Sequence, residues 1–153
     1  MIVFIDEQAP TFFYIFEAAL SSKFSKNHLK TFYSYGDFIR DFERNPEAYE
    51  ALRLLVLDIR VPEVCGQLCF MDGRIVDLVP SYEALGFLGA IDRESNFEIL
   101  KKTRKVVLTQ LSVDAQTYEQ FALYDIDKDH IFDKYSESHL SALKKILEQS
   151  HND

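Results

Sequence analysis

The run Leu54-Leu55-Val56-Leu57 constrains the fold of this chain more than any other segment. Its four consecutive apolar residues show no alternation with polar ones, a pattern typical of a strand that is buried on both faces. Strands of this kind occur mainly in parallel sheets that helices cover on both sides. The sequence therefore predicts an α/β protein in which Asp58 ends a central strand, where open α/β sheets carry their functional groups.

Short β-rich runs alternate with helical patterns along most of the chain. The strands are predicted at 2–5, 30–35, 54–58, 106–109 and 130–132. Helical patterns separate them, at 10–22, 36–52 and 113–124, and a last one follows Ser136. Ser112 and Ser136 are the expected N-caps of the last two helices. This alternation favours a doubly wound sheet of parallel strands in one domain of 153 residues.

The segment 67–94 does not fit a simple crossover between two parallel strands. It contains a predicted hairpin that turns at Asp72-Gly73, followed by a helical pattern from Pro80 to about Ala90. A further helix is predicted up to Thr103. We therefore expect an inserted hairpin and helix between the third and fourth strands, forming a surface for a partner or for self-association.

Composition and charge exclude several classes of protein. A net charge of -8 argues against nucleic-acid binding, which normally needs a basic surface. The basic stretch 101–105 is expected to be a solvated helix end that complements the helix dipole. The sequence contains no window of about 18 apolar residues, so no membrane-spanning helix is predicted. The strand at the N-terminus lacks the basic start of a signal peptide. A cytoplasmic protein is the expectation.

Polar residues end or follow four of the predicted strands: Asp6, Asp58, Thr109 and Lys134. Because the carboxyl ends of parallel strands lie at one edge of a sheet, these side chains are expected to form a cluster. Two carboxylates would suit a hard cation such as Mg²⁺, and a lysine would supply a compact positive charge. Such a cluster is suited to phosphoryl transfer, in which positioning and charge neutralisation carry most of the catalysis.

The ordered set of Asp6, Asp58, Thr109 and Lys134, with Pro62 and Gly66 in a D-x-x-x-P-x-x-x-G run, resembles the receiver domain of two-component response regulators. The resemblance covers residues 1–65 and 105–150, and it implies a flavodoxin-like sheet with strand order 2-1-3-4-5. It also implies a phosphoacceptor that a histidine kinase or phosphotransfer protein phosphorylates, and a switched contact with a downstream protein or a second copy of the chain. In this interpretation the protein is a stoichiometric phosphoacceptor and not an enzyme.

The resemblance assigns a role to each residue of the cluster. Asp58 would accept the phosphoryl group, Thr109 would hydrogen-bond its oxygens and Lys134 would pair with them. Mg²⁺ would be held by carboxylates and one backbone carbonyl, from Asp6, Glu7, Asp58 and Arg60 (carbonyl). Either Asp6 and Glu7 form the acidic pair of the family, or Asp6 alone corresponds to its second member.

Three positions depart from the family pattern. Gln110 stands where a small residue is usual, Tyr135 where proline is usual, and Ile131 where the switch residue is aromatic. These departures support an alternative, a pseudo-receiver that acts as an interaction or dimerisation module without phosphorylation. A hydrolase or phosphatase on the same fold has less support, because no second nucleophile or clear general base accompanies Asp58.

Overall fold

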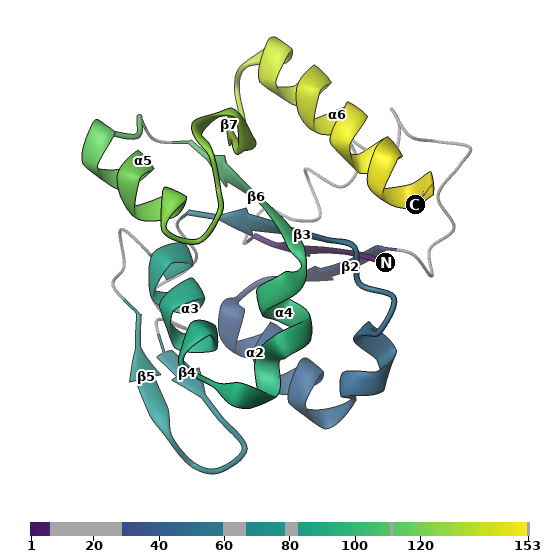
Figure 1. Ribbon diagram of the computed structural model, residues 1–153, viewed down its shortest axis with the longest axis vertical. Helices are drawn as coiled ribbons and strands as arrows, with labels where there is room; N and C mark the ends of the chain where they lie inside the picture. Colours follow the sequence, from purple (N-terminus) through teal and green to yellow (C-terminus); the bar gives the residue numbers. More distant parts are fainter. Residues whose placement is uncertain (7–28, 60–66, 79–82, 111, 153) are drawn as a thin grey trace.

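The computed structural model describes residues 1–6, 29–59, 67–78, 83–110 and 112–152. Five parallel strands form the main sheet, in the order β2-β1-β3-β6-β7 (Figure 1). Their bounds are β1 Ile2–Ile5, β2 Leu29–Phe32, β3 Leu54–Asp58, β6 Arg104–Thr109 and β7 Ile131–Asp133. The α/β class and the predicted order of the parallel strands are therefore confirmed. The predicted helix at 10–22 lies outside the described residues.

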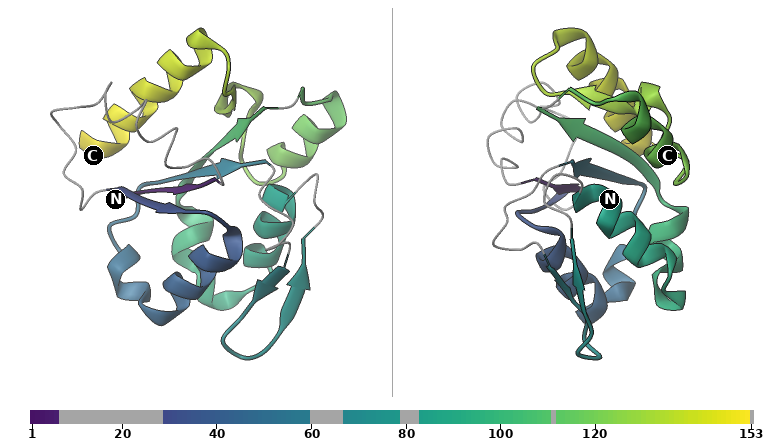
Figure 2. Two further views of the ribbon diagram at one scale, coloured as in Figure 1. Left: turned by 180° about the vertical axis from the view of Figure 1, so that it is seen from behind. Right: turned by 90° about the vertical axis from the view of Figure 1, so that its left-hand side faces the viewer.

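Helices cover both faces of this sheet. They are α2 Tyr35–Arg44, α3 Glu83–Asp92, α4 Glu98–Lys102, α5 Ala115–Ala122 and α6 Glu137–Asn152, with 3-10 turns η2 Pro46–Tyr49, η5 Ser95–Phe97 and η6 Lys128–His130. Figures 1 and 2 show α6 on one face and α2, α3 and α4 on the other. The side chains of each strand alternate between these faces. In β1 and β3 both sets of side chains lie in apolar cores, which is why the sequences of these two strands show no alternation of apolar and polar residues.

Two apolar cores result from this arrangement. The smaller core joins Phe4 and Val56 of the sheet to Leu143 and Leu147 of α6, both of which have no exposed surface. The larger core, on the other face, contains residues of α2, α3 and α4 together with Phe121 of α5. The last helix, predicted after Ser136, therefore packs on the sheet through an apolar stripe that includes Leu143 and Leu147.

The second strand ends earlier than predicted. Ser34 has extended backbone angles, and its hydroxyl accepts a hydrogen bond of 3.1 Å from the backbone N–H of Asp37. Ser34 is therefore an N-cap, and Tyr35 belongs to α2 and not to the strand. The predicted cap of α5 was also wrong by two residues, because the Asp114 carboxylate and not Ser112 accepts from the N–H of Thr117, at 2.7 Å.

The predicted hairpin is present in the segment between β3 and β6. Its strands β4 Gln67–Cys69 and β5 Ile75–Asp77 are antiparallel, and Gly73 in the turn has a φ of 88°. The hairpin lies against α2 (Figure 2), where the absence of a side chain at Gly36 allows the carbonyl oxygen of Gln67 to approach. Leu68 and Phe70 are buried in the larger core, so the hairpin is packed into the main body of the protein.

Hairpin and α3 together leave only part of their surface exposed. Phe87 and Ile91 of α3 are fully or nearly fully buried, whereas Met71 and Ile75 of the hairpin are 68% and 62% exposed. Helix α3 is therefore a structural component of the larger core.

No helix in the described part of the chain has both the length and the apolar character needed to cross a membrane.

Candidate functional site

The four polar residues predicted at strand ends lie at one edge of the main sheet. Asp6 follows β1, Asp58 ends β3, Thr109 ends β6 and Lys134 follows β7. The parallel register aligns Asp58 with Leu108 and Thr109 with Asp133, so these strand ends are direct neighbours. The topology thus brings the candidate residues together from four separate parts of the sequence.

The ammonium of Lys134 lies between two buried carboxylates. Its Nζ is 2.7 Å from Oδ2 of Asp6 and 3.3 Å from Oδ1 of Asp58. The three side chains are between 1% and 4% exposed. In such a poorly hydrated place each charge depends on its partners, because an uncompensated buried charge is strongly unfavourable. The carboxylates therefore converge on a single cationic position.

Thr109 is positioned through its backbone as well as its place on β6. Its carbonyl oxygen accepts a hydrogen bond of 3.0 Å from the N–H of Lys134, which ties the end of β6 to the residue after β7. The residue is 4% exposed, whereas Gln110, which follows it, is exposed.

Tyr35, which the sequence analysis did not identify, supports the backbone of Asp58. The phenol hydroxyl donates a hydrogen bond to the carbonyl oxygen of Asp58. The ring is 1% exposed and stacks on Phe87 of α3, with 4.7 Å between ring centroids. Burial raises the pKa of Tyr35 well above its usual range, and the negative charges of Asp58, Glu83 and Asp6 raise it further. The phenol therefore stays protonated and remains a donor.

Glu83 is an acidic residue near this site that, like Tyr35, was not predicted from the sequence. It opens α3 and is 1% exposed. Its effect on the pKa of Tyr35 indicates that its charge lies near the phenol and thus near the cluster. A signal was present in the sequence, since Glu83 is the only charged residue of the apolar stretch 83–91. Helix α3 thereby adds a buried carboxylate to this region.

The turn after β7 is stabilised by a hydrogen bond between two of its residues. The carboxylate of Asp133 accepts a hydrogen bond of 2.8 Å from the N–H of Tyr135, a turn geometry that aspartate favours. No cis peptide bond occurs in the described ranges, so the peptide between Lys134 and Tyr135 is trans. The Tyr135 side chain is 74% exposed, whereas Ile131 is buried in the larger core.

The described residues supply part of the oxygen ligands expected for a divalent cation. Within the residues that the structure describes, no three His, Cys, Asp or Glu side chains form a group that could hold a metal ion. Asp6 and Asp58 nevertheless converge on one cation, and Mg²⁺ commonly binds through one or two carboxylates while keeping several waters. Glu7 and Arg60, the other expected ligands, lie outside the described residues.

Comparisons with known proteins add no relative. No protein-family model, no curated protein and no solved structure matches this chain. Because one fold can carry many functions, a functional conclusion has to depend on the chemistry of the site.

Proposed function

We propose that the protein is a response-regulator receiver with a flavodoxin-like fold, phosphorylated on Asp58 in a Mg²⁺-dependent reaction. The observation that carries this proposal is the convergence of Asp6, Asp58 and Lys134 at the carboxyl edge of the sheet, with Thr109 on the neighbouring strand end. The phosphodonor is a histidine kinase or a phosphotransfer protein in the cytoplasm. Phosphorylation then changes a surface that binds a downstream protein or a second copy of the chain.

The site residues have complementary roles in this reaction. A carboxylate oxygen of Asp58 attacks the phosphorus of a phosphohistidine, the P–N bond breaks, and an acyl phosphate forms on Asp58. Asp6 and Asp58 would hold the Mg²⁺, whose charge helps to neutralise the phosphoryl oxygens. Lys134 compensates the added negative charge, and the hydroxyl of Thr109 donates a hydrogen bond to a phosphoryl oxygen.

Two residues outside the strand ends, Tyr35 and Glu83, also belong to the proposed site. Through its hydrogen bond to the Asp58 carbonyl, Tyr35 restrains the backbone that carries the phosphoacceptor. Its ring stacks on Phe87, which belongs to the same helix as Glu83. A change of charge at Asp58 would therefore act on α3 through the Tyr35 ring. The adjacent hairpin would then be the surface that binds the downstream partner.

Incubation with acetyl phosphate and Mg²⁺ tests the proposal. Intact-protein mass spectrometry should show the gain of one phosphoryl group, and Asp58→Asn should abolish it. Asp127→Asn, which changes an exposed aspartate after α5, is the matched control and should be phosphorylated like the wild type. Phosphate on the wild type that persists in Asp58→Asn, or no phosphate under any Mg²⁺ concentration, would refute the assignment of Asp58.

The burial of Asp58 favours a second candidate function, the phosphorylation-independent pseudo-receiver. With a side chain 4% exposed and held by Lys134, Asp58 has a structural role that needs no phosphodonor. This function predicts that acetyl phosphate with Mg²⁺ leaves the oligomeric state and partner binding of the wild type unchanged. It also predicts that Asp58→Asn, which keeps the side-chain volume, matches the wild type in both. A phosphorylation-dependent change in either would exclude it.

A further inference from the structure

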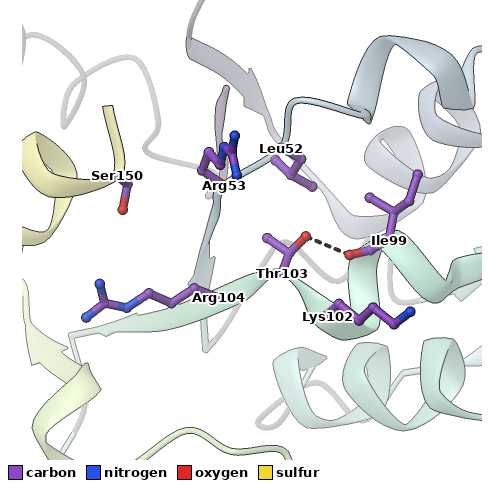
Figure 3. A pocket seen from close by; sticks show the side chains of 7 residues that line it. All are labelled: Leu52, Arg53, Ile99, Lys102, Thr103, Arg104 and Ser150. Carbon is purple, nitrogen blue, oxygen red and sulfur yellow. Dashed lines mark hydrogen bonds between the residues drawn. The ribbon is translucent and has the colours of Figure 1, made fainter. Parts of the chain in front are cut away.

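A pocket lies at the opposite edge of the sheet from Asp58. Its volume is about 430 Å³, within the range of small-molecule sites. Arg53 precedes β3 and Arg104 opens β6, so the pocket is at the amino ends of these strands (Figure 3). Ser150 of α6 and residues of α4 complete its lining. The pocket is therefore separate from the candidate phosphorylation site.

The charge of this pocket is the reverse of the charge of the whole protein. Arg53, Lys102 and Arg104 line it, and no acidic residue is among its described lining residues, although the net charge of the chain is -8. None of these three cations makes a salt bridge in the described part of the chain. Such a concentration of positive charge attracts an anion.

The neighbouring lysines show that this arrangement is not a simple basic stretch. Lys101 is 2.9 Å from the Glu98 carboxylate, and Lys105 donates to the carbonyl oxygens of Lys101 and Thr103 at 2.9 and 2.8 Å. The expected solvated helix end at 101–105 therefore divides into groups with different surroundings. Only Lys102 and Arg104 contribute their charges to the pocket.

The remaining lining restricts the kind of anion. The hydroxyls of Thr103 and Ser150 already donate to the carbonyl oxygens of Ile99 and Ile146, at 2.6 and 2.8 Å. The side-chain donors left for a ligand are therefore the cationic groups, although one nitrogen of Arg104 also lies 3.4 Å from Nε2 of His130. Figure 3 shows Arg53, Arg104 and Ser150 on one side of the pocket and the apolar side chains of Leu52 and Ile99 on the other.

We propose that this pocket binds a phosphomonoester of a small organic molecule. Arginine guanidinium groups match the geometry of phosphate oxygens and bind them with two parallel hydrogen bonds. The phosphate lies between Arg53 and Arg104, and the organic part lies against Leu52 and Ile99. This binding is independent of phosphorylation at Asp58 and needs no Mg²⁺.

Phenyl phosphate, titrated without Mg²⁺ and followed by amide chemical shifts in NMR, is the probe that tests the proposal. Saturable shifts are expected at Thr103 and Arg104 and not at Thr109. The variant Arg53→Gln/Arg104→Gln should weaken binding at least tenfold. The control Arg40→Gln/Lys101→Gln removes the same charge outside the pocket and should change the Kd less than twofold.

Two further arms of the experiment separate the alternatives. Inorganic phosphate should bind more weakly than phenyl phosphate, and benzoate more weakly again, if a dianion with an apolar body is preferred. Should the arginine variant fail to fold by circular dichroism, Lys102→Gln against Lys101→Gln repeats the comparison with one charge. Equal weakening by the pocket and control variants, or absence of saturable binding, would overturn the proposal.

Discussion

Replacing Lys134 by methionine removes the ammonium between two buried carboxylates. Its Nζ lies 2.7 Å from Asp6 and 3.3 Å from Asp58, and all three side chains are at most 4% exposed. Removing one partner of a buried ion pair costs about 3–5 kcal/mol, because the other charge is left uncompensated. We expect Lys134→Met to lose about 3 kcal/mol, since methionine replaces most of the aliphatic stem. For a protein of this size, that loss lowers the Tm by roughly 6–12 °C.

Urea unfolding at pH 7.5 measures this loss, and a second substitution identifies its cause. Lys134→Met/Asp58→Asn should recover at least about 1 kcal/mol relative to Lys134→Met, because one of the two repelling carboxylates is gone. Lys145→Met, on the exposed side of α6, is the control and should cost less than about 0.5 kcal/mol. A loss below about 1 kcal/mol for Lys134→Met, without coupling to Asp58, would refute the reasoning.

Two predictions concern other parts of the fold. Leu143→Ala should lower the free energy of unfolding in urea by about 3 kcal/mol, because the Leu143 side chain is fully buried between α6 and the sheet. The control Leu123→Ala, at a residue 81% exposed, should lower it by less than about 0.5 kcal/mol. Equal costs would contradict the assigned packing. Burial lowers the pKa of Lys105 from 10.5 to about 8, with Asp125 and Asp92 opposing the shift. As the pH rises, the folded protein therefore loses this proton before the unfolded chain does. The free energy of unfolding of the wild type relative to Lys105→Met should then rise between about pH 8 and 10, by about 1–2 kcal/mol after allowance for partial exposure. A flat or falling difference would contradict the shift.

The sheet and the edge that carries the candidate site were predictable from local patterns. The strand at 54–58 was predicted with its observed bounds, because an unbroken apolar run leaves few alternatives. Once the strands are parallel, residues that follow them must share an edge, which is how Asp6 and Lys134 come together. The end of β2 was missed because the capping role of Ser34 competes with the β-rich pattern around it.

The parts of the site that depend on tertiary packing were not predictable in the same way. Tyr35 looked like a strand residue, and only the approach of α2 to β3 brings its hydroxyl to the Asp58 carbonyl. A glutamate in the first turn of a helix is usually solvated, so the burial of Glu83 requires knowledge of what covers α3. The basic pocket likewise combines residues from three separate segments, including Arg53 and Ser150.

Binding of beryllofluoride, a phosphoryl mimic, is the most direct measurement of the central claim. Fluorine NMR on the wild type and on Asp58→Ala, with and without Mg²⁺, should show a bound signal only for the wild type with Mg²⁺. Size-exclusion chromatography of the same samples should show whether assembly is the output. A bound signal that survives Asp58→Ala, or no signal with Mg²⁺ present, would contradict a phosphorylatable receiver.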